Sequence, residues 1–297
     1  MQLLCNIPEV LPQPCVATIG FFDGVHRGHR YLIEQVREVA AAHGFASEVV
    51  TFPVHPRKVV QPEYHPELLT TYEEKVALLA ETGLDYCMML DFTPEVAILS
   101  AKEFMLFLYN HYNIRALVIG YDHRFGHNRS EGFDDYVRYG QELGIEVILA
   151  HAYIDKDVAV SSSVIRQLLS EGNVSEAASC LGYDYFLNGI VVSGYRVGRK
   201  IGFPTANLRV DDPDKLVPSD GVYAVHVTVA GQSYGGMLSI GYRPTIEVNI
   251  FNFHSDIYEQ YICLSFVRYL RPELKFDSID GLIAQLHKDK EIASRYL

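Results

Sequence analysis

Apolar and polar positions in the first half of the chain alternate in the pattern of an α/β domain. Short apolar runs typical of buried strands are separated by longer stretches with the periodicity of amphipathic helices. Strands are expected at 15–20, 48–52, 86–90, 116–120 and 146–150, and helices at 28–42, 72–81, 101–111 and 133–143. This alternation predicts a doubly wound parallel sheet covered on both faces, with ligands at the carboxyl ends of the strands.

The pattern changes after residue 182. Strand-like stretches at 188–194, 222–230, 233–240, 247–253 and 261–267 are separated by Gly, Pro and Asp turns, with no helical periodicity between them. They predict a small antiparallel β-barrel. A helical stretch at 161–181 leads into the junction, and an amphipathic stretch at 279–292 predicts a terminal helix that covers the barrel. The expected fold class is α/β followed by a barrel, with domains at 1–182 and 183–297.

Composition narrows the class of protein. The 297 residues are 48% hydrophobic and carry a formal net charge of −12. An acidic surface disfavours nonspecific binding to nucleic acids or membranes, but it does not exclude local phosphate sites. The five cysteines are scattered without a C-x-x-C pair, and the N-terminus lacks the pattern of a signal peptide. We therefore expect a cytoplasmic enzyme with small-molecule partners, and with neither nucleic acid nor membrane among them.

The most informative segment is residues 20–29, Gly-Phe-Phe-Asp-Gly-Val-His-Arg-Gly-His, between a predicted strand and a predicted helix. Gly24 and Gly28 let the backbone turn tightly and approach a ligand. His26 and His29 then stand at a helix N-terminus, where backbone N–H groups and the helix dipole favour phosphate. Two imidazole donors there can stabilise charge on a transferring phosphoryl group. Taken alone, the pattern also fits a turn with two surface histidines.

Two further segments suggest phosphate chemistry. Residues 161–166, Ser-Ser-Ser-Val-Ile-Arg, open a predicted helix, and arginine suits bidentate phosphate contact, although a serine N-cap is ordinary helix chemistry. Residues 194–207 form a Gly-rich basic loop that ends in Pro-Thr-Ala-Asn. Its backbone could wrap phosphates, and the Thr205 hydroxyl and the Asn207 amide oxygen could bind Mg²⁺. The chain has no G-x-x-x-x-G-K-[ST] motif, and composition alone does not separate this loop from a basic turn.

These segments, taken in order, resemble the bacterial bifunctional riboflavin kinase/FAD synthetase (FMN adenylyltransferase) family over essentially the whole chain. His-x-Gly-His and Ser-Ser-x-x-Ile-Arg resemble the nucleotide motifs of the nucleotidyltransferase superfamily. Gly-Phe-Pro-Thr-Ala-Asn, followed by Gly-Val-Tyr-Ala at 221–224, resembles the riboflavin kinase module. Weaker matches lie at 51–56, 120–126, 239–249 and 270–276. The resemblance implies conversion of riboflavin and ATP to FMN and ADP, and then of FMN and ATP to FAD and pyrophosphate, with Mg²⁺.

The resemblance also assigns roles to residues. It makes Glu247 the general base on the riboflavin hydroxyl, and His26 and His29 catalytic in adenylyl transfer. Binding of ATP and phosphate falls to Gly20, Phe22, Gly28, Ser162, Ser163, Arg166, Gly198, Lys200, Gly202 and Asn207. Flavin binding falls to His55, Pro56, Asp122, Arg124 and Arg271, and Mg²⁺ binding to Thr205 and Asn207. Arg271 could instead pair with Glu273.

Other functions stay open at this point. Family members usually carry several Gly- and Asn-rich residues between Arg-Pro-Thr and the Glu-Val strand, whereas Thr245 here runs directly into Ile246. The alternatives are therefore an adenylyltransferase with an inactive kinase barrel and a flavin-binding regulatory protein. An adenylyltransferase for a nicotinate or pantetheine nucleotide would leave the barrel without a purpose. We expect a monomer or a weak homo-oligomer.

Overall fold

A computed structural model describes residues 1–5, 11, 13–61, 63–120, 123–155, 158–194, 197–241 and 245–297. These residues form two compact units, Met1–Ser161 and Ser162–Leu297. Each unit has its own sheet and its own buried core, so each is described by itself.

The first unit is built on a six-stranded sheet in the order β1-β4-β3-β2-β5-β6. Its strands are β1 (Gln2–Cys5), β2 (Cys15–Ile19), β3 (Ala46–Thr51), β4 (Tyr86–Met89), β5 (Ile114–Ile119) and β6 (Glu146–Leu149). All neighbouring strands are parallel, which confirms the predicted α/β architecture. The strand β1 was not predicted, because only Leu4 of its four residues is buried and the apolar alternation is too short to stand out.

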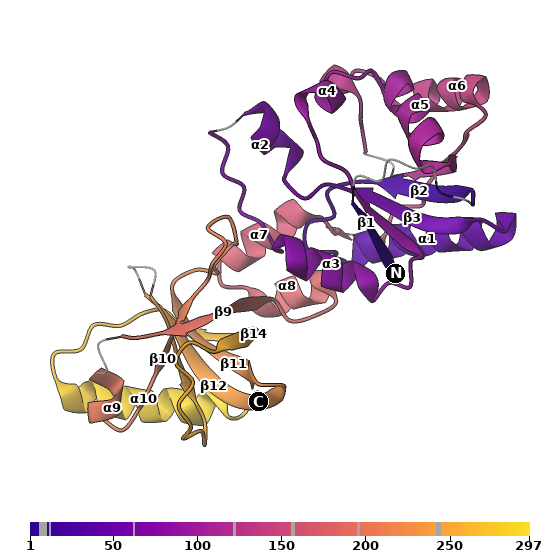
Figure 1. Ribbon diagram of the computed structural model, residues 1–297. Helices are drawn as coiled ribbons and strands as arrows, with labels where there is room; N and C mark the ends of the chain where they lie inside the picture. Colours follow the sequence, from indigo (N-terminus) through magenta and orange to yellow (C-terminus); the bar gives the residue numbers. More distant parts are fainter. Residues whose placement is uncertain are drawn as a thin grey trace. The chain divides into compact units, whose positions relative to one another are not determined.

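Helices cover both faces of this sheet, as the apolar pattern of β2 requires (Figure 1). Val16 faces the cluster that includes Val36 and Ala40 of α1 (Arg27–His43). Cys15, Ala17 and Ile19 face the opposite cluster, to which α5 (Ala101–Tyr112) and α6 (Phe133–Leu143) contribute. Successive residues of a strand point to opposite faces, so a strand buried on both sides is apolar throughout.

The remaining elements of the first unit are short and mostly follow strand ends. They are α2 (Pro56–Val60), α3 (Tyr72–Ala80), α4 (Pro94–Ala97), the 3₁₀ helix η1 (His127–Arg129), β7 (Ile154–Asp155) and β8 (Val158–Ala159). The helix α3 begins with a complete capping box in which Thr71 and Glu74 bond to each other's backbone N–H groups. This cap fixes the first turn of α3 beneath the carboxyl ends of β2 and β3, where Lys75 bonds to the loops that follow them.

The second unit begins with two helices, α7 (Ser162–Ser170) and α8 (Val174–Leu181). The sequence predicted helical structure throughout 161–181, but the chain turns between the two helices, where Gly172 has a φ of +79°. Such a left-handed backbone favours glycine and breaks the helix. The hydroxyl of Ser175 donates to the Val267 carbonyl and so ties α8 to the barrel. These helices therefore pack with the barrel although they precede the predicted domain junction.

Six antiparallel strands close into a barrel in the order β10-β13-β12-β11-β14-β9, which confirms the predicted architecture. They are β9 (Phe186–Val192), β10 (Ala206–Arg209), β11 (Gly221–Val229), β12 (Gln232–Ile240), β13 (Ile246–Ile250) and β14 (Tyr261–Arg271). The strand β10 was not predicted, because the Pro-Thr-Ala-Asn stretch has the composition of a loop. The strand closes the barrel by pairing with both β9 and β13.

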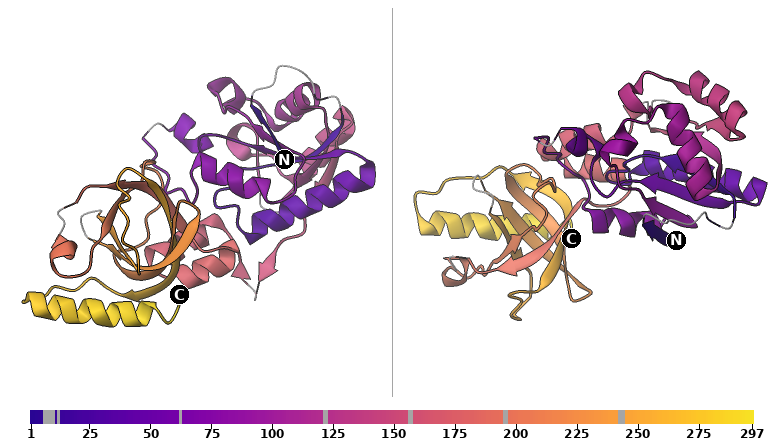
Figure 2. Two further views of the ribbon diagram at one scale, coloured as in Figure 1. Left: turned by 60° about the horizontal axis from the view of Figure 1, so that its bottom comes forward. Right: turned by 45° about the horizontal axis from the view of Figure 1, so that its top comes forward.

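The terminal helix α10 (Ile279–Ala293) lies along the outside of the barrel, as predicted (Figure 2). Ala293 packs with Phe203, Met237 and Phe251 in a small apolar cluster on this side of the barrel. The short helix α9 (Val197–Lys200) lies in the loop between β9 and β10. In the part of the chain that the structure describes, no helix is both long and apolar enough to cross a membrane.

Candidate active sites

The two motif histidines of the first unit lie together at the start of α1. The rings of His26 and His29 stack with centroids 3.6 Å apart and planes 17° apart. His26 is the N-cap residue, and its Nδ1 accepts a hydrogen bond from the backbone N–H of His29 at 3.3 Å. An accepting Nδ1 carries no proton, so the neutral His26 ring has its proton on Nε2. His26 thus caps the helix through Nδ1, and its ring lies against that of His29.

His29 is also held in its neutral form. Burial is the main cause that lowers its pKa well below the ordinary value, and the positive charges of His26, Lys75 and His123 act in the same direction. Its Nδ1 is buried without a hydrogen-bond partner among the described residues. A buried imidazole nitrogen with an unused hydrogen bond is suited to meet a polar ligand at this helix N-terminus.

The backbone before the histidines is strained. Phe22 has a φ of +55° and Val25 a φ of +37°, values that L-residues with side chains rarely adopt. The strain is balanced by Asp23, whose buried carboxylate accepts from the backbone N–H groups of Leu69 at 2.9 Å and of Thr70 at 3.1 Å. A strained turn that the surrounding structure over-determines is common at functional sites, where it presents groups in one fixed geometry.

Two residues predicted to bind ATP, Phe22 and Gly28, lie next to the histidine rings. The Phe22 ring meets the His29 ring edge-on at 5.0 Å. A Cβ atom on Gly28 would lie 3.1 Å from the His26 ring. Gly20 ends the β2 region and donates its N–H to the Val50 carbonyl at 3.0 Å. The structure thus brings Gly20, Phe22 and Gly28 to the histidine site, next to His26 and His29.

Two predicted flavin residues of the first unit, Pro56 and Arg124, line a small apolar cavity of about 90 Å³. Pro56, Arg124, Phe52 and Phe125 are among the residues that line it. His55 is the N-cap of α2 and its ring packs edge-on against Phe21 at 4.7 Å. His55 therefore joins the loop after β3 to the loop after β2. Asp122 lies outside the described residues.

The other residues predicted to bind the nucleotide in adenylyl transfer lie at the start of α7. Ser162 is the first residue of this helix, and Ser163 and Arg166 follow within its first two turns. They belong to the second unit, whereas His26 and His29 belong to the first.

The predicted kinase residues converge on the paired strands β10 and β13. The Thr205 hydroxyl donates to Oε2 of Glu247 at 3.2 Å. Asn207 lies directly opposite Glu247 in the antiparallel register, so their side chains are neighbours on one face. A Cβ atom on Gly194 would lie 2.2 Å from the Asn207 amide nitrogen. The strand pairing thus assembles a threonine hydroxyl, an amide and a carboxylate at one point.

The Gly-rich loop folds back on itself just before Thr205. The Gly198 carbonyl accepts from the Phe203 N–H at 2.8 Å, and Gly202 has a φ of +86°. A Cβ atom on Gly198 would lie 2.2 Å from the Phe203 carbonyl oxygen, so the turn requires glycine. Lys200 is exposed at the end of α9. The amide of Asn249 donates to the Pro204 carbonyl at 2.7 Å and holds the end of the loop.

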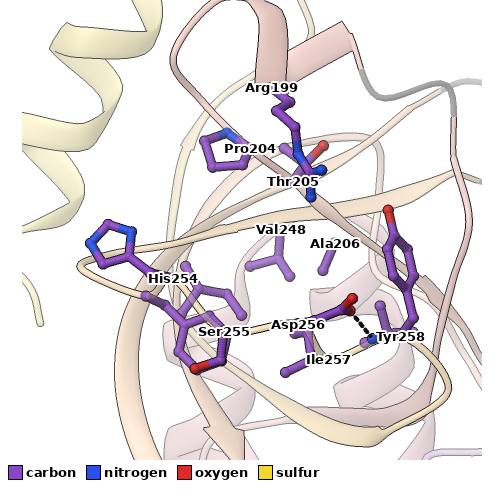
Figure 3. Close-up of a pocket in the computed structure, with 13 residues that line it drawn as sticks. Arg199, Pro204, Thr205, Ala206, Val248, His254, Ser255, Asp256, Ile257 and Tyr258 are labelled. Atoms are coloured by element: carbon purple, nitrogen blue, oxygen red, sulfur yellow. Dashed lines mark hydrogen bonds between the residues drawn. The ribbon is translucent and has the colours of Figure 1, made fainter.

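Two cavities meet at Thr205. The larger, of about 460 Å³, is lined by Arg199, Thr205 and the loop from Phe253 to Tyr258 (Figure 3). The Arg199 side chain extends from α9 toward Thr205, and Tyr258 donates its backbone N–H to Asp256 at 3.0 Å across the loop (Figure 3).

The smaller cavity, of about 260 Å³, has Glu247 and Asn249 in its wall together with leucines of α10. Val248 and Ile250 line the larger cavity instead. Because successive residues of a strand point to opposite sides, β13 forms a partition between the two cavities. Thr205 lies on the border of both cavities.

Arg271 lies in the wall of the smaller cavity, and its ion-pair partner is Asp289 rather than Glu273. Its guanidinium makes a bidentate pair with the buried Asp289 of α10, at 2.7 Å for the shortest contact. Gln285 also donates to Asp289, at 2.8 Å. The arrangement joins β14 to α10 and fixes the helix that forms one wall of the cavity. The sequence missed this role, because Asp289 is 18 positions away and reads as a solvated helix residue.

Lys75 and Asn249 are buried near the two sites but were not predicted from the sequence. Lys75 follows Glu73 and Glu74 in a predicted helix, where a lysine is expected to face solvent, yet only 2% of it is exposed. Asn249 is similarly buried beside Glu247. The alternation of polar and apolar residues in 247–250 was the available signal, since Glu247 and Asn249 share one face of the strand.

Comparisons with known proteins show the family to which each half of the chain belongs. Residues 9–164 match the family model described as FAD synthetase, and residues 181–297 match the model described as riboflavin kinase. A bifunctional riboflavin kinase/FMN adenylyltransferase of Listeria monocytogenes is 37% identical, over 93% of this chain and 90% of its own. The protein of the same name in Escherichia coli K12 is 34% identical, over 98% of this chain and 95% of its own.

The fold has a solved counterpart over its whole length. A crystal structure named as a macrolide-efflux protein from Streptococcus pneumoniae matches with a TM-score of 0.89 and 32% identity, covering 99% of each chain.

Proposed function

Because this chain belongs to the bifunctional riboflavin kinase/FMN adenylyltransferase family, we infer that it converts riboflavin to FMN and FMN to FAD. ATP is the co-substrate of both steps. The family models cover both halves of the chain and the named relatives are bifunctional, so an adenylyltransferase with an inactive kinase barrel is not supported. A flavin-binding regulatory protein is not supported either, because the same relatives are named as enzymes.

The observation that carries the kinase assignment is the pair of cavities that share Thr205, with Glu247 in the wall of the smaller one. Phosphoryl transfer needs a nucleotide and an acceptor that reach one point from two sides. The smaller cavity offers leucine side chains for an apolar ring system, and Glu247 in its wall. We assign riboflavin to this cavity, and ATP to the larger one beside Arg199.

In the kinase step, Glu247 orients the riboflavin 5′-hydroxyl and accepts its proton as the oxygen attacks the γ-phosphorus of ATP. The new P–O bond forms while the bond between the γ-phosphorus and the β–γ bridging oxygen breaks, and ADP leaves with that oxygen. Before substrate binds, Glu247 accepts the Thr205 hydroxyl hydrogen bond, which holds the carboxylate in place. The N–H groups of Ile201 and Phe203 both donate to the Gly198 carbonyl, which fixes the tight loop beside Thr205.

The residues around Thr205 fit a magnesium ion. Thr205 and Asn207 offer neutral oxygen ligands next to the Glu247 carboxylate, and oxygen is the donor that Mg²⁺ prefers. Among the described residues there is no group of three or more His, Cys, Asp or Glu side chains that could hold a metal alone. This matches an ion shared with substrate phosphates, whose charge it would neutralise when bound.

In the adenylyl step, a phosphate oxygen of FMN attacks the α-phosphorus of ATP, the bond to the β-phosphate oxygen breaks, and pyrophosphate leaves. His29 stays neutral, and His26 and His29 are assigned to donate N–H groups to the charge that develops on the α-phosphate. Ser162, Ser163 and Arg166 are assigned to the triphosphate on the strength of their sequence motif. FMN is assigned to the loops that carry His55, Pro56 and Arg124, on the strength of their sequence motifs and of the apolar cavity that Pro56 and Arg124 line.

These assignments place the functional boundary near residue 182. The adenylylating module would comprise 1–182 and so include α7, and the kinase module would comprise 183–297. On this assignment, α7 and α8 are part of the adenylylating module. In the structure, however, they pack with the barrel. We propose that the chain acts in the cytoplasm as a monomer or a weak homo-oligomer.

Chromatography of flavins after incubation of the purified protein with ATP, Mg²⁺ and either riboflavin or FMN tests the function. FMN followed by FAD from riboflavin is the expected result. FAD formed only from supplied FMN would overturn the kinase assignment, and no product from either flavin would overturn both assignments. Omitting Mg²⁺ in the presence of a chelator should abolish FMN formation, and continued formation would contradict the metal site.

A further inference from the structure

A buried lysine joins the two loops that frame the adenylylation site. Lys75 is only 2% exposed, and its Nζ donates to the Phe52 carbonyl at 2.7 Å and to the Phe21 carbonyl at 3.2 Å. Phe52 follows β3 and Phe21 follows β2. The Thr51 hydroxyl, which also donates to the Phe21 carbonyl at 3.1 Å, lies 3.5 Å from Nζ. One ammonium group therefore bonds to the carboxyl ends of both strands.

The two loops carry the predicted ligand residues. The loop after β2 contains Phe22 and ends at His26, and the loop after β3 contains His55, which packs on Phe21. The Lys75 Nζ also lies 4.0 Å from the centre of the Phe21 ring, in the geometry of a cation–π contact. No carboxylate is hydrogen-bonded to Nζ in the contacts described, so carbonyl dipoles and an aromatic face carry the interaction.

Lys75 acts on a turn that cannot hold its shape alone. Phe22 and Val25 have positive φ values, and such strain persists only where surrounding contacts enforce it. Asp23 fastens the middle of the turn to Leu69 and Thr70, and Lys75 fastens its beginning. All three partners, Leu69, Thr70 and Lys75, lie in one segment whose helix start is fixed by the Thr71 capping box.

We propose that Lys75 is a positioning residue for adenylyl transfer, which holds the histidine turn against the flavin loop and adds a fixed positive charge beneath the phosphate site. The proposal rests on the proposed function of the first unit. Lys75 does not touch the reacting atoms, so its loss should lower the rate of the chemical step more than the affinity for FMN.

The charge of Lys75 gives the proposal a second readout. Burial lowers its pKa to about 8, against the opposing effect of the Asp23 carboxylate and of Cys87 in β4. His29 in α1 is the other titratable group that interacts with Lys75, and it stays neutral because its own pKa is far lower. A lysine with a lowered pKa loses its proton as the pH rises, so FAD formation should decline above about pH 8.

The test compares the variants Lys75→Met and Lys75→Arg with the matched surface variant Lys102→Met, in the full chain. We expect Lys75→Met to lower kcat for FAD formation from FMN about tenfold or more with a smaller change in KM. Its remaining activity should not decline above about pH 8, whereas Lys75→Arg, if it supports turnover, should move the decline to higher pH. Riboflavin phosphorylation in the same samples should stay within about twofold of the wild type.

The possible results distinguish a failure of the role proposed for Lys75 from a failure of the proposed function. FAD formation by the wild type with an unchanged kcat in Lys75→Met would overturn the role of Lys75 and leave the function intact. A loss confined to KM, or a decline at high pH that persists in Lys75→Met, would also overturn it. If Lys75→Met does not fold, Thr51→Val, which removes one contact to the Phe21 carbonyl, should lower kcat and Thr51→Ser should restore it. An unchanged kcat in Thr51→Val would then contradict the proposal.

Discussion

At the scale of single residues, the proposed kinase step depends most on Glu247. It lies in the wall of the smaller cavity and accepts a hydrogen bond from the Thr205 hydroxyl at 3.2 Å. Removing a general base typically costs a factor of about 10² to 10⁴ in rate. Glu247→Gln keeps the shape of the side chain and removes its basicity, so FMN formation should fall by about that factor while FAD formation from supplied FMN is unchanged. The surface variant Glu291→Gln serves as the control, and equal rates in the two variants would contradict the role of Glu247.

A second residue, Glu48 in β3, lowers the stability of the first unit as the pH rises. It is fully buried, and among the described residues neither carboxylate oxygen has a hydrogen-bond partner. Burial raises its pKa from 4.5 to about 8, despite the opposing effect of the Cys15 thiol. The folded state therefore holds the proton more tightly than the unfolded state. The free energy of unfolding should fall as the pH rises from about 4.5 to about 8 and then level off.

Glu48→Gln should remove this pH dependence. The variant should gain stability relative to the wild type as the pH rises from about 5 to about 8, by an amount on the order of a few kcal/mol. Denaturant unfolding at several pH values, followed with a probe in the first unit, measures the change. The exposed variant Glu34→Gln should keep the wild-type profile. A parallel profile in Glu48→Gln would show that Glu48 is not the titrating group.

At the scale of elements, the Gly-rich loop between β9 and β10 depends on a close backbone contact. A Cβ atom on Gly198 would lie 2.2 Å from the Phe203 carbonyl, and the main chain would have to move away from Thr205. Gly198→Ala should therefore lower FMN formation by about tenfold or more and leave FAD formation from FMN unchanged. Gly132→Ala is the control, because a Cβ atom there meets nothing within 4 Å. Kinase rates that are the same in Gly198→Ala and Gly132→Ala would contradict the importance of the turn.

Elements with a long apolar pattern were predicted from the sequence. Short elements whose structure depends on pairing with distant strands were not. The strand β2 was predicted because all five of its residues are buried in the sheet. The strand β10 was missed, since two of its four residues are only half buried and its pairing with β13 is what makes it a strand. The same limit applies to the sites. The motifs indicated His26, Thr205 and Glu247, whereas the roles of Lys75 and Asp289 arise from residues distant in sequence.

At the scale of the whole molecule, the chain carries two separate sets of reactive groups on two different folds. The parallel sheet gathers loops at the carboxyl ends of its strands, where His26 and His29 stack. In the barrel, opposite faces of β13 line two cavities that share Thr205, and the proposed function assigns one substrate to each. Because the two sets are assigned to different reactions, we expect the two reactions to be separable by single substitutions.

The most direct test is the flavin time course of His29→Ala and Thr205→Ala, each supplied with ATP, Mg²⁺ and either riboflavin or FMN. His29→Ala should accumulate FMN from riboflavin and form almost no FAD from either substrate. Thr205→Ala should form little FMN from riboflavin and yet convert supplied FMN to FAD at the wild-type rate. Loss of both activities in either folded variant would contradict two independent sites.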